Sequence, residues 1–208
     1  MRTIAYVDGF NLYYGSLKRS PHKWLDICQF FRNTLPVGHT LEKVKYFTAR
    51  VSALPSDLNA PIRQDAYLRA LRAHCGATIE IIFGHFSVQN IRRPLTADPT
   101  KFAEIIKTEE KGSDVNLSVE LVNDAWRNSF DCAAVVSNDA DLVRGMQIVK
   151  QQLKKRVILY TPGAPRRFPL ASLRMWSHKQ LGVLDADLAA SQLPTSLQGG
   201  SITKPKSW

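Results

Sequence analysis

The sequence lacks long apolar runs and contains few cysteines. None of its apolar runs approaches the roughly 20 residues that a membrane-spanning helix needs. An apolar strand predicted to begin at Thr3 leaves no room for a signal peptide. The three cysteines, an odd number placed far apart, suggest neither a disulfide framework nor a zinc-binding spacing. We therefore expect a cytoplasmic protein that does not contact membranes.

Acidic residues are also scarce relative to basic ones. Lys and Arg total 28 against 18 Asp and Glu, which gives a formal net charge of +10. A chain this basic often binds a polyanion, and nucleic acid is the first candidate, although a generically basic surface is the alternative. The length of 208 residues and the 44% hydrophobic content suit one domain with a proper core and a short tail.

Several nucleotide and phosphate motifs are missing. No Gly-x-Gly-x-x-Gly follows a predicted strand, and no Gly-Lys-Ser/Thr occurs, which disfavours dinucleotide-binding and phosphate-loop proteins. Asp8 is followed by glycine and phenylalanine, so the Asp-x-Asp of haloacid dehalogenase phosphatases is absent as well. The five histidines do not pair at metal-ligand spacing.

Strand-like and helix-like segments alternate along the chain. The predicted strands cover 3–7, 41–51, 78–83, 132–136 and 157–160, and the predicted helices cover 24–31, 61–74, 114–126 and 142–153. This alternation predicts an α/β fold with a mostly parallel central sheet covered on both faces. Residues 84–112 are predicted to leave the sheet as a hairpin-like excursion, and 170–184 to form one or two helices. The helix at 114–126 is expected to bury one apolar side made of Val115, Leu117, Val119, Leu121, Val122, Ala125 and Trp126.

The C-terminal end has a different composition. It is rich in Pro, Ser, Gly and Lys, which is typical of flexible segments. We therefore divide the chain into one domain at 1–185 and a flexible tail at 186–208.

Acidic residues follow two of the predicted strands. Asp8 ends the first strand, Asp139 and Asp141 follow the fourth, and Asp114 begins the helix before the fourth. If that helix runs antiparallel to the sheet, all four carboxylates lie at the edge where open α/β sheets bind ligands. Gathered carboxylates repel one another unless a cation lies among them, and oxygen ligands favour Mg²⁺ or Mn²⁺. On a basic protein this predicts metal-assisted phosphodiester hydrolysis. The alternative is that Asp139 or Asp141 only caps the following helix.

Three segments resemble one known family. YVDGFNL at 6–12, EKGSDVNL at 110–117 and VVSNDADL at 135–142 are similar, in this order, to motifs of the NYN domain. The NYN domain, also called the LabA-like group, belongs to the PIN-like nuclease superfamily. The resemblance covers roughly residues 1–185 of the chain.

This resemblance implies a three-layer α/β/α fold of PIN-like, Rossmann-like topology and a ribonuclease that uses Mg²⁺ or Mn²⁺. It implies that Asp8, Asp114, Asp139 and Asp141 hold the metal and carry catalysis, and that Asn11 hydrogen-bonds near the metal or the scissile phosphate. Glu120 occupies a position where many relatives carry Asp, which makes it an outer metal ligand by the same resemblance. Ala140 and Asn138 replace small residues or glycine, and neither change removes a carboxylate.

Basic loops supply the expected contacts to RNA, with DNA as the less favoured partner. We expect nucleic acid to be bound by Arg92, Arg93, Lys111, Arg166 and Arg167. The alternative function is a non-catalytic nucleic-acid-binding or regulatory module with the same fold, and a further one is interaction with an acidic protein. A homodimer is compatible with this kind of domain.

Overall fold

A single parallel sheet organises the structure, a computed structural model that describes residues 1–206 and 208. Its six strands lie in the order β3-β2-β1-β6-β7-β8, and every neighbouring pair is parallel. The strands are β1 (Arg2–Asp8), β2 (Thr40–Thr48), β3 (Ile79–Phe83), β6 (Cys132–Val136), β7 (Arg156–Thr161) and β8 (Lys179–Gly182). Parallel strands need crossover connections, which explains why helices cover both faces.

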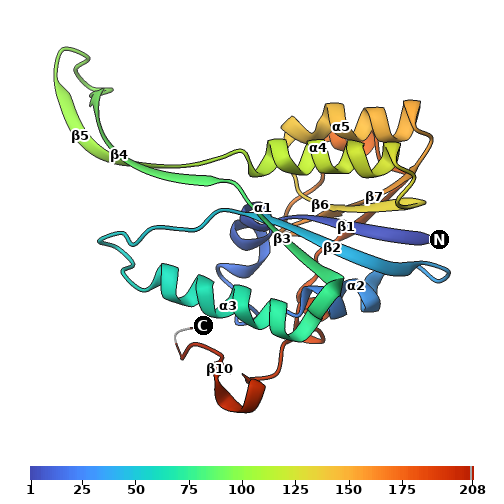
Figure 1. Ribbon diagram of the computed structural model, residues 1–208. Helices are drawn as coiled ribbons and strands as arrows, with labels where there is room; N and C mark the ends of the chain where they lie inside the picture. Colours follow the sequence, from blue (N-terminus) through green and yellow to red (C-terminus); the bar gives the residue numbers. More distant parts are fainter. Residues whose placement is uncertain (207) are drawn as a thin grey trace.

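The helices form two outer layers (Figure 1). One face of the sheet carries α4 (Ser113–Trp126) and α5 (Val143–Gln147), and the other carries α2 (Ile27–Thr34) and α3 (Ala60–Cys75). Side chains alternate along β1, so that Tyr6 packs in the α4 core while Ala5 and Val7 pack in the α2 and α3 core. The predicted three-layer α/β/α fold is therefore confirmed.

The remaining elements are short. They are α1 (Gly9–Leu12), α6 (Ala171–Met175), α7 (Asp185–Ala189), β9 (Ser196–Leu197), β10 (Ile202–Thr203), the π-helical turns Tyr13–Leu17 and Ile148–Gln152, and the 3₁₀ turns Gly76–Thr78, Ala140–Leu142 and Gln198–Gly200. Among the described residues, none of the helices has both the length and the apolarity that crossing a membrane requires.

The strand order reverses between β1 and β6. From β1 the chain adds β2 and β3 on one side, and β6, β7 and β8 then follow on the other side. In open α/β sheets this reversal opens a crevice outside the carboxyl ends of the two central strands, and ligands bind there. Asp8 ends β1 and Ser137 directly follows β6, so both residues lie at the reversal point.

A hairpin projects from the body as an arm (Figure 1). It consists of β4 (His85–Pro94) and β5 (Phe102–Lys111), which pair with each other in a sheet of their own. This confirms the predicted excursion at 84–112. The arm exposes large apolar side chains, namely Val88, Leu95, Phe102, Ile105 and Ile106. An isolated two-stranded hairpin is marginally stable in water, so these side chains suit an element that meets a ligand or partner.

Two expectations about helices are confirmed only in part. Residues 170–184 form α6 and then the edge strand β8, which lacks an apolar alternation because an edge strand buries little. In α4 the expected buried residues Val115, Val119 and Trp126 are instead 60%, 59% and 77% exposed. Apolar residues occur all around this helix, so periodicity did not distinguish its buried face from this exposed stripe.

The C-terminal segment is folded, contrary to the expected flexible tail. Leu188, Leu193 and Ile202 are buried against the core that α2 and α3 cover. The Trp24 indole donates to the Pro194 carbonyl at 2.8 Å, and the Leu193 N–H donates to the Trp24 carbonyl at 2.9 Å. The composition of this segment is that of a linker, but a few well-spaced apolar side chains anchor it through tertiary contacts.

We expect Leu193→Ala to lower the free energy of unfolding by about 2–4 kcal/mol, because it leaves a cavity in a buried contact. Urea unfolding followed by circular dichroism measures the change. Leu184→Ala, whose parent side chain is 43% exposed, is the matched control and should change stability by less than about 0.5 kcal/mol. Equal, negligible effects of both variants would mean that the segment does not stabilise the fold.

Candidate metal centre

Asp8 is a buried carboxylate held by three hydrogen bonds. Its Oδ1 accepts the Asn11 backbone N–H at 2.9 Å, and its Oδ2 accepts the Asn11 side-chain amide at 2.9 Å and the Ser137 hydroxyl at 3.0 Å. Asp8 is also the N-cap of α1, which explains why the motif turns at this point. The Asp8 side chain therefore links the end of β1 to the residue that follows β6.

Gly9 allows this turn to lie against the neighbouring strand. A Cβ at Gly9 would lie 2.8 Å from the Phe47 carbonyl oxygen and 2.9 Å from the Tyr46 hydroxyl. Any side chain there would push α1 away from β2 and disturb the orientation of the preceding carboxylate. The glycine after Asp8 is thus required by close packing.

Burial raises the pKa of Asp8 above its ordinary value. The hydrogen bonds from Asn11 and Ser137 oppose this shift, and the nearby charge of Asp139 adds to it. Desolvation is the largest of these effects, so the ionised form of Asp8 is costly in the metal-free protein. A cation at this edge would relieve that cost.

The loop after β6 continues the hydrogen-bonded set. Ser137 Oγ accepts the Asp139 N–H at 3.1 Å, and the Asn138 N–H donates to Asn11 Oδ1 at 3.3 Å. Asp139 Oδ1 accepts the Asp141 N–H at 3.0 Å and caps the 3₁₀ turn Ala140–Leu142. The capping interpretation therefore holds for one oxygen of Asp139, and the exposed Asp141 lies in the turn itself.

Asp114 lies at the same edge of the sheet. The first turn of α4 is placed beside the end of β3, where the Asn116 amide donates to the Phe83 carbonyl at 3.4 Å. The helix also packs against β1 and against the 3₁₀ turn Ala140–Leu142. Asp114 Oδ1 accepts the Val115 N–H at 2.8 Å, and the side chain is half-buried.

These acids share an edge without converging on a single point. In the part of the chain that the structure describes, the one group of three or more His, Cys, Asp or Glu with ligand atoms within 4.8 Å of one another lies elsewhere. Mg²⁺ commonly takes one or two carboxylates and keeps several waters. The oxygen donors therefore fit Mg²⁺ or Mn²⁺ in a site with few direct ligands.

Glu120, expected as an outer ligand, forms an ion pair. Its carboxylate lies 2.6 Å from Lys45 Nζ, which also lies 2.6 Å from Asp124. The Tyr6 hydroxyl donates to Asp124 at 2.7 Å. Burial lowers the pKa of Lys45, but its hydrogen bonds to Asp124 and Glu120 outweigh this and raise it. Sequence reasoning missed the partner because Lys45 lies on a strand 75 residues before Glu120.

The loop with Arg166 and Arg167 is attached to the acidic edge. Asn138 Nδ2 donates to the Phe168 carbonyl at 3.2 Å, and Asn138 Oδ1 accepts the Leu170 N–H at 2.9 Å. Both arginines are exposed, and the Phe168 ring is 82% exposed. An exposed aromatic ring between arginines and acids is a suitable surface for stacking a base.

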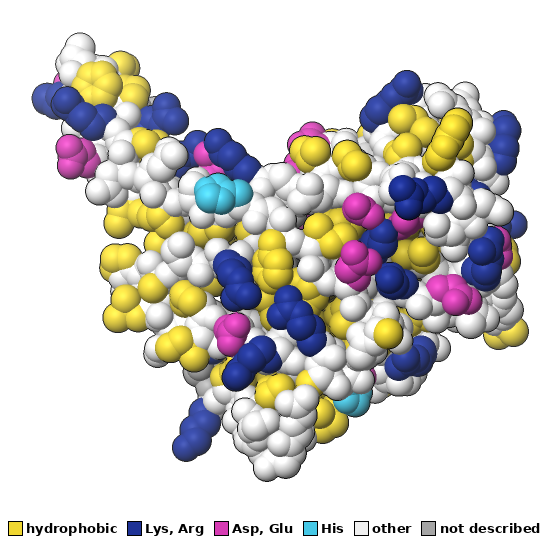
Figure 2. Space-filling view, viewed as in Figure 1, with side chains coloured by type: hydrophobic (Ala, Val, Ile, Leu, Met, Phe, Trp, Pro, Cys, Tyr) yellow, Lys and Arg dark blue, Asp and Glu magenta, His cyan; other side chains and the backbone are white. Residues whose placement is uncertain are grey.

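The other predicted basic residues lie on the arm. Arg92 and Arg93 are exposed, and the Arg92 guanidinium lies 5.4 Å from the centre of the Phe102 ring. Lys111, at the base of the arm, lies 3.4 Å from Glu109. The visible face shows basic side chains dispersed among acidic and apolar ones (Figure 2).

A row of aromatic rings connects the first motif with the arm. Phe10 stacks on Tyr14 on one side and on Phe86 on the other, with 6.4 Å between ring centres in both pairs. Tyr14 is 60% exposed. The sequence did not indicate the contact between Phe10 and Phe86, since only the fold brings β4 beside the first motif.

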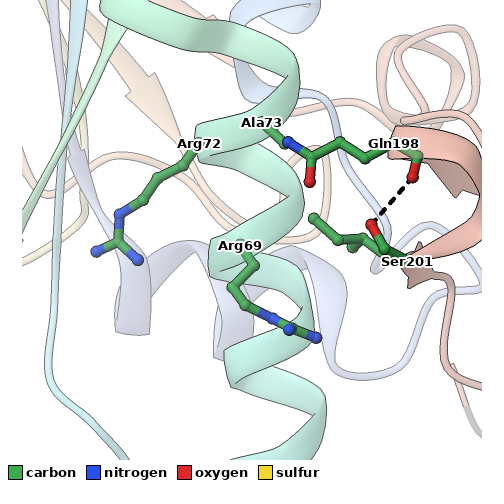
Figure 3. Close-up of a pocket in the computed structure, with 6 residues that line it drawn as sticks. Arg69, Arg72, Ala73, Gln198 and Ser201 are labelled. Carbon is green, nitrogen blue, oxygen red and sulfur yellow. Dashed lines mark hydrogen bonds between the residues drawn. The ribbon is translucent and has the colours of Figure 1, made fainter.

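A surface pocket of about 410 Å³ lies away from these acids (Figure 3). It is lined by α3 and the C-terminal segment, with Arg69 and Arg72 on one side and Gln198 and Ser201 on the other. Arg69 already lies 3.2 Å from Asp65. The pocket contains none of the predicted catalytic residues.

We expect Glu120→Gln to leave divalent-metal binding unchanged, because its carboxylate pairs with Lys45. Lys45→Met should lower the free energy of unfolding by about 3–5 kcal/mol, since it leaves Asp124 buried without a cation. Thermal shifts with and without Mn²⁺ measure both effects. If Glu120→Gln abolished the Mn²⁺-induced shift while keeping its fold, the assignment of Glu120 to the ion pair would be wrong.

Comparisons with known proteins identify the family and the fold of the chain. The NYN domain profile matches residues 2–175. The 6-hydroxy-3-succinoylpyridine 3-monooxygenase HspA of Pseudomonas putida is 32% identical over an alignment that covers the whole chain and 75% of that protein. The crystal structure of a Vibrio parahaemolyticus protein of unknown function has the same fold, with a TM-score of 0.57 and 19% identity over 88% of this chain and 93% of that one. The chain therefore belongs to the NYN domain family.

Proposed function

We propose that the chain is a divalent-metal-dependent ribonuclease that hydrolyses RNA phosphodiester bonds at the reversal point of its sheet. The observation that carries this proposal is the buried Asp8 carboxylate, which Asn11 and Ser137 hold beside Asp139. An acidic site on a chain of net charge +10 suits a polyanion that is bound by basic residues and cleaved with the help of a cation.

The proposed metal set comprises Asp8, Asp114, Asp139 and Asp141. Bound there, Mg²⁺ or Mn²⁺ would neutralise charge on the phosphate and acidify an attacking water. Asn11 and Ser137 orient Asp8, while Asn138 fixes the loop that presents Asp139. Glu120 is left out of this set because it pairs with Lys45.

RNA would lie across the loop with Phe168 and toward the arm. Arg166 and Arg167 would contact the phosphate backbone, and Phe168 would stack on a base. Lys111, Arg92 and Arg93 would extend this contact along the arm. Single-stranded RNA suits an exposed ring better than a duplex does, because its bases are free to stack.

A second candidate is oxygenation of a small aromatic acid. The match to a protein named as a monooxygenase covers the whole chain at 32% identity. The pocket in Figure 3 is bordered by Arg69, whose positive charge suits an acidic substrate, whereas the Arg72 side chain points away toward the Phe83 ring. Oxygen consumption with 6-hydroxy-3-succinoylpyridine and a reduced nicotinamide tests this candidate. Product formation that resists Asp139→Asn would favour it over the ribonuclease.

Two expectations about assembly and location remain predictions. For a homodimer, the exposed stripe of Val115, Val119 and Trp126 on α4 offers an apolar surface. For a cytoplasmic location, the three cysteines are all free and buried, which fits a reducing compartment.

We expect Asp139→Asn to slow cleavage of labelled RNA in Mn²⁺ by at least about 100-fold, because it removes a charged metal ligand. A chelator should stop RNA cleavage by the parent protein. Glu104→Gln, an exposed acid on the arm, is the matched control and should cleave at the parental rate. Burial raises the pKa of Asp8, so protons should compete with the metal and activity should fall as the pH falls toward that raised pKa.

Salt-sensitive RNA binding without cleavage in any divalent metal would contradict the proposal of a metal-dependent ribonuclease. It would support the alternative of a non-catalytic binding or regulatory module with the same fold.

We expect Phe168→Ala to weaken binding of single-stranded RNA by about 5- to 150-fold, which corresponds to the 1–3 kcal/mol typical of base stacking. Fluorescence anisotropy under chelator measures binding without cleavage. Trp126→Ala, which removes an exposed aromatic ring at the far end of α4, is the control and should bind normally. Equal weakening by both variants would argue against a stacking role for Phe168.

A further inference from the structure

A second group of ligating side chains lies on the face of the sheet that α2 and α3 cover. Asp26, Cys28 and Cys75 each offer one ligand atom, and these three atoms all lie within 4.8 Å of one another. All three residues are buried. Asp26 and Cys28 stand at the start of α2, and Cys75 is the last residue of α3, so two helices distant in sequence bring them together.

The spacing fits tetrahedral coordination. Zinc binds thiolate sulfur at about 2.3 Å and carboxylate oxygen at about 2.1 Å, which places sulfur and oxygen ligands roughly 3.6 Å apart. Cys75 Sγ lies 3.7 Å from Asp26 Oδ1. The Cys75 thiol also contacts Cys28. The one measured separation, a thiol-to-carboxylate hydrogen bond between Cys75 and Asp26, is therefore already close to the ligand spacing of a zinc site, and Cys28 lies within 4.8 Å of both atoms.

His74 supports the carboxylate from outside. Its Nε2 lies 2.9 Å from Asp26 Oδ2, the oxygen that does not contact Cys75. The His74 side chain is 35% exposed, so the cluster borders solvent on this side. A partner that fixes the orientation of a ligand in this way is a regular feature of metal sites.

Ordinary packing accounts for only part of this arrangement. Asp26 caps α2, since its Oδ1 accepts the Gln29 N–H at 2.9 Å. Capping requires one acceptor, however, and gives no reason for the Cys75 thiol and the His74 imidazole to meet the same carboxylate, with the Cys28 thiol within 4.8 Å. Two sulfur ligands select zinc over Mg²⁺, whereas the acidic edge offers oxygen donors to Mg²⁺ or Mn²⁺. The two sites therefore differ in chemistry as well as in position.

We propose that Asp26, Cys28 and Cys75 supply three ligands to a Zn²⁺ ion, with water as the fourth ligand and His74 holding the Asp26 carboxylate in place. The ion would join the start of α2 to the end of α3. It would also stabilise the attachment of the C-terminal segment, because the Asp26 N–H donates to the Ser191 carbonyl at 2.9 Å. Binding requires thiolates, so it releases thiol protons.

The test uses Co²⁺ as a spectroscopic substitute for Zn²⁺. The full chain is purified under reducing conditions, freed of metal with a chelator and titrated with Co²⁺ without oxygen. We expect the thiolate-to-cobalt absorption band of a tetrahedral site, and we expect Zn²⁺ to displace it. Cys28→Ser and Cys75→Ser should lose the band, and His74→Ala should weaken binding by about 10- to 100-fold.

Two control variants distinguish this site from the third thiol and from the acidic edge. Cys132→Ser removes the remaining buried thiol and should keep the band. Asp139→Asn alters the acidic edge and should keep it as well, so failure of the ribonuclease proposal would leave this result unaffected. Circular dichroism identifies any variant that does not fold. Zn²⁺ should raise the melting temperature of the parent protein, but not that of the variants that lack Cys28 or Cys75.

The absence of a cobalt band in the folded, reduced parent protein would overturn the proposal. The same conclusion would follow if the Cys28→Ser/Cys75→Ser double variant kept the band. A chain that is isolated with a Cys28–Cys75 disulfide and takes up no metal after reduction would also overturn it.

Discussion

The position of the Asp8 carboxylate is the constraint on which the proposed site depends. A buried carboxylate is costly unless hydrogen bonds or positive charge compensate for its lost hydration. Here Asn11 and Ser137 supply three hydrogen bonds, but burial still raises the pKa of Asp8. The two donor residues come from the turn after β1 and the end of β6. The carboxylate therefore holds together the two strands between which the sheet reverses.

Much of the fold follows from local patterns in the sequence. Apolar strands such as 132–136 end in polar residues, and their regular alternation with helices predicts a parallel sheet with its acids at one edge. The structure confirms the sheet and its two covered faces. The positions of Asp8 and Ser137 at the reversal point follow from the strand order, which the alternation of elements in the sequence does not predict.

Other features depend on tertiary contacts that local patterns do not contain. The C-terminal segment has the composition of a linker, yet Leu193 is buried against the core. Lys45 on β2 forms an ion pair with Glu120 on α4, and no spacing in the sequence indicates this pair. Phe10 and Phe86 stack only because the arm begins beside the first motif. In each case the partner is far away along the chain.

Two parts of the fold carry two kinds of chemistry. The carboxyl edge of the sheet has carboxylates, an amide and a hydroxyl, which suits a hard cation exchanging water and substrate. The α2 and α3 face has thiols and a carboxylate in a buried cluster, which suits a stable structural ion.

Anomalous diffraction from a crystal soaked in Mn²⁺ tests the central claim most directly. The account predicts a manganese peak at the carboxyl edge between β1 and β6, within ligand distance of Asp8 or Asp139. Waters should complete its coordination, because the four acids do not converge on one point. A crystal with well-ordered acids and no manganese at this edge would contradict the account.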